Sequence, residues 1–180
     1  MTDARSCLIR VDFPRLMGEQ TVLDVFRDTD ITEEYIGWLN SPEVVRYSNQ
    51  RFQQHTYETC MAYISSFHYS RNLFIKVLRK LDNSLIGTMT AYYSAPHQTV
   101  DVGIMIGDKS SRGQGYGLDA WSTLLKWLSS QSCVRKITAG AMHSNTGMIR
   151  LMEQSGMTIE AIRSKQELLS DVPQGLLYYR

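Results

Sequence analysis

The chain has 180 residues, of which 43% are hydrophobic and 21% charged, the composition of an ordinary globular domain. Its 19 Lys and Arg residues against 18 Asp and Glu give a net charge of +1. This balance excludes the global basic field that nucleic-acid-binding proteins use. No repeat or linker divides the chain, so we expect one domain over residues 1–180 and no nucleic-acid partner.

The cysteines and the hydrophobic segments indicate in which cellular compartment the protein is expected. Cys7, Cys60 and Cys133 lie far apart and form no C-x-x-C pair, which predicts a reducing, cytoplasmic compartment. The N-terminal segment lacks the apolar stretch of a signal peptide, and no run of about 18 apolar residues exists, so we expect no membrane partner. The 4 histidines lack the spacing of metal ligands, so we expect no metal.

The first 70 residues predict one strand and three helices. The strand covers residues 22–26. Asp30, with Glu33 three positions later, resembles a capping box that opens a helix through Leu39. Ser41, followed by a proline at the first helical position, predicts a second, short helix through Tyr47. Thr56 caps a longer helix, whose apolar face is Tyr57, Met61, Ile64 and Phe67.

Strands dominate the middle of the chain. We expect strands at 73–77, 85–93 and 99–106, with a turn at Asp82 and Asn83 between the first two. In the third strand two sets of residues alternate between faces. One face carries Val100, Val102, Ile104 and Ile106, and the other carries Asp101, Gly103 and Met105.

The last third alternates helices and strands. A helix over 115–129 has the strongest apolar periodicity, and a second over 146–154 ends before Gly156, a residue typical of the position after a helix. Strands are expected at 135–142, 157–169 and 176–180. The fold class is therefore α+β, with a mixed, mostly antiparallel central sheet flanked by helices.

A glycine-rich turn precedes the strongest helix. Gly113, Gly115 and Gly117 permit a tight turn and a close approach to a ligand. The start of the following helix attracts anions, most often phosphate, and Arg112 adds a charge. The spacing fits neither the dinucleotide fingerprint nor the P-loop. Without further context, a tight strand-to-helix connection that binds nothing remains an alternative.

Two motifs resemble the GNAT superfamily of N-acetyltransferases. Arg112-x-x-Gly115-x-Gly117 is similar to its acyl-CoA signature, Gln/Arg-x-x-Gly-x-Gly/Ala, and the segment from Asn145 to Met157 is similar to a second motif. The resemblance covers residues 20–180 and implies a GNAT fold with acetyl-CoA as co-substrate. It assigns CoA binding to Ile104, Met105, Ile106, Arg112, Gly113, Gln114, Gly115, Tyr116, Gly117 and Asn145. Asn145 has the alternative role of a helix cap.

The resemblance implies acyl transfer to an amine, which must first lose a proton. Asp101 is our candidate for this step, directly or through a water, and the alternative is a solvated strand carboxylate. The backbone N–H of Met105 or Ile106 would polarise the thioester carbonyl.

The acid that protonates the leaving thiolate is where the sequence departs from the family. Many members carry a tyrosine at the position of Met152, which has no proton to donate. Ser155 is the substitute we name, and no acid at all is a further alternative, since a thiol has a pKa near 8.5. Other hydroxyl candidates are Tyr92, Tyr93 and Tyr116.

The acceptor is expected to contact the N-terminal helices. The run W-L-N-x-P-E-V-x-x-Y, residues 38–47, is similar to the branch with ribosomal-protein N-terminal acetyltransferases, and closer still to acetyltransferases of nucleotide-linked amino sugars. Candidate substrate residues are Trp38, Tyr47, Arg51 and Tyr92, the rings for stacking and the arginine for a phosphate. The alternative is that such residues belong to the core or the surface.

We therefore expect an acetyl-CoA-dependent N-acetyltransferase that acts on a small-molecule amine, with a nucleotide-linked amino sugar preferred. The alternatives are a protein or peptide N-terminus as acceptor, and a CoA-binding module without turnover. The resemblance also implies a homodimer, an assembly frequent in the family.

Overall fold

The computed structural model describes residues 13–180, so Cys7 and the rest of the start of the chain lie outside it. Eight strands form one sheet in the order β1-β2-β3-β4-β5-β6-β8-β7. The strands are β1 Leu16–Met17, β2 Thr21–Val25, β3 Leu73–Arg79, β4 Leu85–Ser94, β5 Thr99–Ile106, β6 Lys136–Met142, β7 Ile159–Leu169 and β8 Val172–Tyr179. The α-helices are α1 Glu33–Leu39, α2 Tyr57–His68, α3 Tyr116–Ser129 and α4 Thr146–Gln154.

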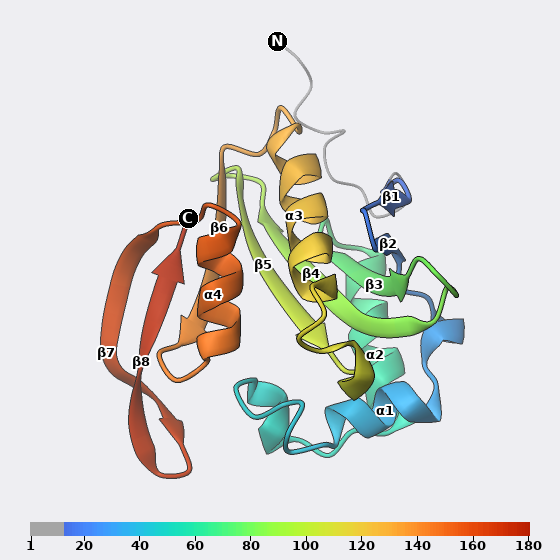
Figure 1. The fold of residues 1–180 in the computed structure, drawn as a ribbon, viewed down its shortest axis with the longest axis horizontal. Coiled ribbons are helices and arrows are strands. Elements are labelled where there is room, and N and C mark those ends of the chain that lie inside the picture. The colour runs from blue at the N-terminus through green and yellow to red at the C-terminus, as the bar shows by residue number, and fades with distance from the viewer. Residues whose placement is uncertain (1–12) are drawn as a thin grey trace.

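Helices cover both faces of the sheet (Figure 1). The α3 face buries Trp121, Leu124 and Leu128, which lie completely inside the larger core cluster. The other face carries α1 and α2, and its smaller cluster contains Phe26, Phe67 and Phe74 among others. Each helix thus turns one apolar stripe to the sheet, as the periodicity predicts. The mixed, mostly antiparallel sheet flanked by helices is confirmed.

The alternation in β5 is confirmed and divides its residues between the two clusters. Val100 and Val102 are buried in the larger cluster, and Ile104 packs against it. Met105 packs instead against the smaller cluster, on the α1 and α2 side. Side chains that alternate with the valines, Asp101 included, therefore face the side of the sheet that carries α1 and α2.

The sheet forks between β5 and β6. These two strands pair in parallel only from Thr99 with Lys136 to Asp101 with Thr138 within the described chain. From Ala139 onward β6 pairs with β8 instead, while β5 continues along β4 to Ile106. Figure 1 shows the two strands diverging toward the segment between α1 and α2.

The helix expected at residues 41–47 does not form, and this prediction is wrong. The segment consists of turns, followed by a 3-10 helix at Asn49–Phe52. The Asn40 side chain donates to the backbone oxygen of His55 (2.8 Å) and accepts from its backbone nitrogen (2.9 Å). This pair of bonds closes a loop over residues 40–55, and the closed loop replaces the helical hydrogen bonds that a local pattern predicts.

Helix α1 begins at a different cap from the one expected. Thr32 is the N-cap, and its hydroxyl accepts a bond from the backbone of Tyr35. Asp30 instead accepts both from the Arg27 backbone and from the ammonium of Lys76 (2.9 Å). By contrast, the expected cap at Thr56 is confirmed.

Two strands differ from the expectation. Strand β1 was not expected, because it has too few residues to give a periodic pattern. Strand β8, expected from residue 176, begins at Val172 although Pro173 follows directly. Pro173 lies opposite Leu168 near the turn of the β7–β8 hairpin. None of the helices within residues 13–180 combines the length and apolar character that crossing a membrane requires.

Candidate active site

A cavity of about 590 Å³ lies at the fork. Strands β4 and β5, helix α4 and the segment between α1 and α2 contribute to its walls. Residues from the predicted CoA set and from the predicted acceptor set line the same space. They are Tyr47, Tyr92, Ile104, Met105, Ile106, Arg112 and Asn145.

One wall of the cavity is the edge of β5. Beyond Asp101 this strand has β4 on one side, while β6 has turned away on the other. Backbone groups of β5 that point toward β6 are therefore available to a ligand lying in the fork. Gly103 and Gly140 also line the cavity. A side chain at Gly103 would meet the Thr90 hydroxyl at 2.9 Å, so this part of the fork is open because the residue is glycine.

The glycine-rich turn forms the start of α3 as the sequence predicts. Gly113 and Gly115 have φ of +72° and +89°, left-handed values that favour glycine. Gly115 is the N-cap, and Asp119 makes the first helical bond to its carbonyl oxygen. The N–H groups of Tyr116 and Gly117 therefore point out of the helix end, the arrangement that attracts phosphate.

A partly buried ionic network fixes the loop before this turn. Arg79 donates to Asp108 (2.9 Å) and to the Ser111 hydroxyl (3.0 Å), and Ser110 and Ser111 also donate to Asp108. Burial acts to raise the pKa of Asp108, but these hydrogen bonds and the Arg79 charge outweigh it and hold the pKa below its usual value. The carboxylate therefore stays ionised and keeps the loop in place. The sequence analysis missed this network.

Arg112 has a different surrounding from the one expected of a phosphate ligand. Its guanidinium donates to the backbone oxygens of Ile106 and Gly107 (both 3.1 Å) and to the carboxylate of Glu43 (2.7 Å). These bonds tie the end of β5 to the segment after α1. Gln114, another predicted CoA residue, donates its side-chain amide to Ser110 (2.6 Å).

Asp101 is the last residue of β5 that pairs with β6. It accepts a hydrogen bond from the Thr138 hydroxyl (2.9 Å) and lies directly opposite Tyr92 on β4. Its side chain reaches solvent, yet the surrounding protein atoms desolvate the carboxyl. This desolvation raises the pKa of Asp101 above its usual value, although the bond from Thr138 acts in the opposite direction.

Tyr92 lines the cavity beside a residue that the sequence analysis did not select. The hydroxyls of Tyr63 on α2 and Tyr92 on β4 lie 2.7 Å apart, and both residues line the cavity. Burial raises the pKa of Tyr63, and the bond to Tyr92 adds to the effect. Tyr63 lies four residues before Phe67, so the helical period indicates that it faces the sheet. Nothing in the sequence pairs it with Tyr92.

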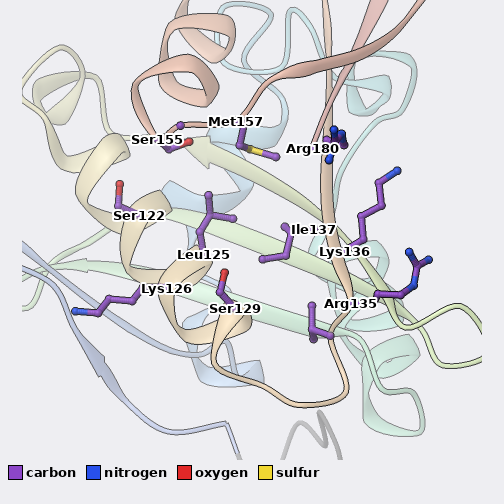
Figure 2. A pocket seen from close by; sticks show the side chains of 12 residues that line it. Ser122, Leu125, Lys126, Ser129, Arg135, Lys136, Ile137, Ser155, Met157 and Arg180 are labelled. Atoms are coloured by element: carbon purple, nitrogen blue, oxygen red, sulfur yellow. The ribbon is translucent and has the colours of Figure 1, made fainter.

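The structure separates Ser155 from the other candidates. Asn145 is the N-cap of α4, accepts from the Met148 backbone and lines the fork, whereas Ser155 follows the opposite end of the helix. Its hydroxyl accepts from the Trp121 indole (3.1 Å) and donates to the Met152 backbone. Ser155 lines a second pocket, of about 530 Å³, beside α3 and β6 (Figure 2). The structure therefore places Ser155 outside the fork cavity.

Two of the expected acceptor residues are used elsewhere. Trp38 is buried in the smaller core cluster, and a Cβ on Gly107 would collide with its indole. The Arg51 guanidinium donates to the backbone oxygens of Ser48 (2.7 Å) and Leu168 (2.9 Å). The core alternative thus holds for Trp38, and Arg51 joins two segments of backbone. Tyr47 and Tyr92 remain as cavity residues.

Across residues 13–180, no group of three or more His, Cys, Asp or Glu side chains is arranged to hold a metal ion.

Comparisons with known proteins agree with this geometry. A sequence model described as "Acetyltransferase (GNAT) domain" matches residues 21–158. An N-acetyltransferase 9-like protein of Nematostella vectensis is 24% identical over 153 residues, which are 79% of this chain and 77% of that protein.

Solved structures share the fold. An acetyltransferase of the GNAT family from Bacillus anthracis superposes with a TM-score of 0.78 at 20% identity, covering 92% of this chain and 96% of its own. The ribosomal L7/L12 alpha-N-protein acetyltransferase RimL, solved with coenzyme A, gives a TM-score of 0.78 at 11% identity, with 89% and 93% covered. The family match spans most of the chain, and the fold agrees with it. The chain therefore belongs to the GNAT family and is an acetyltransferase.

Proposed function

We propose that the protein transfers an acetyl group from acetyl-CoA directly to a primary amine bound in the fork cavity. The observation that carries the proposal is that one cavity adjoins the free edge of β5, the cap of α4 and the segment between α1 and α2. Two reactants held side by side in such a space react as if in one molecule, which removes much of the entropic barrier.

The chemistry assigned to this chain's residues is limited. An N–H at Met105 or Ile106 donates to the oxyanion that develops on the thioester carbonyl. Asp101 accepts the proton of the amine, directly or through a water. Its raised pKa supports this role, because a base whose pKa lies closer to neutral holds the proton more readily. The pyrophosphate of CoA binds at the start of α3, at the backbone of residues 113–117.

The charges around the cavity bear on the acceptor. Among the described residues that line it, Glu43 and Arg112 are the charged ones, and they pair with each other. We therefore propose a small acceptor that carries no charged group other than the amine itself in the part that enters the cavity. A nucleotide-linked amino sugar remains our first candidate. Tyr47 and Tyr92 would contact its sugar or base, and Arg46, which stacks on Tyr47, would pair with its phosphate.

A protein N-terminus is the second candidate, because RimL, with a similar fold, is named for acetylating a ribosomal protein. The third alternative, a CoA-binding module without turnover, is not retained, since the chain belongs to a family of acetyltransferases. A cytoplasmic location stays a prediction, and a homodimer stays one from the family resemblance.

The test is CoA release from acetyl-CoA with pooled amines, with the products identified by mass. The pools contain amino-sugar nucleotides, polyamines, amino acids and peptides with free N-termini. We expect a gain of one acetyl group on an amino-sugar nucleotide. Acetylation of peptides alone would overturn this acceptor in favour of the second candidate, and no release with any pool would overturn the proposed function.

A further inference from the structure

A chain of polar groups runs along one end of the fork. Thr138 donates to Asp101 across β5 and β6, Asp101 lies opposite Tyr92 across β4 and β5, and the hydroxyl of Tyr92 lies 2.7 Å from that of Tyr63. Directly opposite residues of an antiparallel pair share one face of the sheet, with Cβ atoms about 5 Å apart. The carboxyl group and the two phenols therefore lie on the same side of the sheet.

Two members of this cluster, Tyr63 and Tyr92, line the cavity in which the proposed reaction takes place, and that reaction needs a proton donor for the leaving thiolate. Met152, at the position where many family members carry a tyrosine, is completely buried in the larger core cluster and has no proton to give. Ser155 faces another pocket. Tyr92, in contrast, lines the fork cavity and is 41% exposed, so a bound molecule can reach its hydroxyl.

We propose that Tyr92 is the catalytic acid that protonates the CoA sulfur, that Tyr63 is the residue that positions it, and that Asp101 returns the proton to Tyr92. This assignment rests on the proposed function, since it adds the second proton transfer to the same reaction.

The proton balance closes within the cluster. The amine nitrogen attacks the thioester carbonyl carbon, and the C–S bond breaks as the Tyr92 hydroxyl gives its proton to the sulfur. The neutral amine loses one proton to Asp101 as the amide forms, directly or through a water, and an amine that binds as its ammonium form first gives its extra proton to solvent. Asp101 then passes this proton to the Tyr92 phenolate, directly or through one water, which restores both groups. The products are the N-acetyl amide and the free thiol of CoA.

Tyr63 acts on Tyr92 through the hydrogen bond between their hydroxyls. The ring of Tyr63 packs edge-on against Phe67 and Phe74, at 5.1 and 5.2 Å between centroids, so its hydroxyl has a fixed position. A donor fixed in this way stabilises the Tyr92 phenolate that forms as the sulfur takes its proton. Two titratable groups face Tyr92 from neighbouring elements, Tyr63 from α2 and Asp101 from β5.

The first experiment replaces Tyr92 with phenylalanine and measures kcat with acetyl-CoA and the pool member that the wild type acetylates. We expect kcat of Tyr92→Phe to fall about 10- to 100-fold, with the KM for acetyl-CoA changed little. The matched control is Tyr93→Phe. Tyr93, one of the hydroxyl candidates from the sequence, is the next residue of β4. Its hydroxyl donates to the backbone of Cys133 on the opposite side of the sheet, so it faces away from the fork cavity and is not the acid.

The second readout is the pH profile of kcat. In the wild type we expect kcat to fall at alkaline pH, because Tyr92 must keep its proton to serve as an acid. This alkaline fall should be absent from the residual activity of Tyr92→Phe. In Tyr63→Phe it should move to higher pH, since the hydroxyl that stabilises the Tyr92 phenolate is lost. A merely structural role for Tyr63 would lower activity equally at every pH.

The outcomes separate this proposal from the one on which it rests. If the wild type and Tyr93→Phe acetylate an amine and Tyr92→Phe matches their kcat and pH profile, the proton donor is overturned while the proposed function stands. If the wild type releases no CoA with any pool, both are overturned. Thermal unfolding of each variant identifies losses of activity that are caused by unfolding. If the alkaline fall of kcat in Tyr63→Phe lies at the same pH as in the wild type, Tyr63 is removed from the proposal.

Discussion

At the scale of single residues, Asp119 joins α3 to the turn between β1 and β2. Its carboxylate accepts the backbone N–H groups of Glu19, Gln20 and Thr21 at 2.8–3.0 Å, and also the hydroxyl of Thr21. Burial acts to raise the pKa of Asp119, but these hydrogen bonds outweigh it and lower the pKa. A carboxyl whose pKa is lower in the folded state stabilises the fold above its unfolded pKa, and this contribution is lost as the pH falls through the folded pKa.

We therefore expect Asp119→Asn to lower the free energy of unfolding at pH 7 by about 1–2 kcal/mol, because the amide carries no charge and has one acceptor oxygen. The difference from the wild type should shrink as the pH falls below about 4, where the wild-type carboxyl is protonated in the unfolded chain. Urea unfolding at several pH values measures this. The control is Asp171→Asn, at an exposed turn residue with φ of +64°, a conformation that asparagine tolerates. Equal stability of Asp119→Asn and the wild type at pH 7 would contradict the expectation.

The roles of single residues could be predicted from the sequence where the partner is close along the chain. The cap at Thr56 needs only its own first turn, and the left-handed Gly115 is required by its own turn. The bond between Tyr63 and Tyr92 spans 29 positions, and it depends on how α2 lies on the sheet. The indole of Trp38 was assigned to the acceptor, because no local pattern indicates that Gly107 makes room for it.

At the scale of elements, two glycines allow a matched test of the turn before α3. Gly115 and Gly156 have φ of +89° and +85°, so alanine is strained to a similar degree at each. A Cβ at Gly115 would meet the Gln20 side chain at 3.3 Å, and at Gly156 no described atom lies within 4 Å. Gly115 begins α3 and lines a cavity next to the turn between β1 and β2, whereas Gly156 follows the far end of α4.

We expect both alanine variants to lose about 1–2 kcal/mol of stability, the cost of the left-handed conformation. Only Gly115→Ala should weaken acetyl-CoA binding, by about tenfold or more. The reason is that the backbone N–H groups at the start of α3 would shift away from the position proposed for the CoA phosphates. Isothermal titration with acetyl-CoA, together with thermal unfolding, measures the two effects separately. Unchanged acetyl-CoA affinity in Gly115→Ala would place the pyrophosphate elsewhere.

Helices and strands could be predicted from the sequence where local patterns determine them, and could not where contacts between distant residues do. Helix α3 and strand β5 have continuous apolar periods, which tertiary burial reinforces, and both form close to the expected ranges. The helix expected at 41–47 had a good start signal but yields to the bonds between Asn40 and His55. Asp30 is a good cap by type, yet Lys76, 46 positions away, takes its carboxylate. In both cases a polar group bonds to a partner that is distant in sequence, and Asp30 does so while it also accepts from the nearby Arg27 backbone.

At the scale of the whole molecule, the acceptor side of the cavity is formed by segments that are far apart in sequence. The segment between α1 and α2 contributes Tyr47, and two arginines hold this segment to the rest of the chain. Arg112 joins it to the end of β5 through Glu43, and Arg51 joins it to the β7–β8 hairpin through the backbone oxygen of Leu168. The geometry of the acceptor wall therefore depends on contacts that involve neither substrate.

Arg51→Lys tests this dependence, because it keeps the charge but removes the planar donor pair that reaches Ser48 and Leu168 together. We expect the KM for the amine to rise several-fold, which corresponds to about 1 kcal/mol of lost binding free energy. The KM for acetyl-CoA should stay unchanged. The control is Arg163→Lys, which alters an exposed arginine of the same hairpin that stacks on Tyr178. If Arg51 bound a substrate phosphate instead, lysine would also supply a charge to that phosphate, and the effect would be confined to phosphorylated acceptors. A rise in KM for phosphorylated and unphosphorylated amines alike therefore identifies Arg51 as a support of the wall.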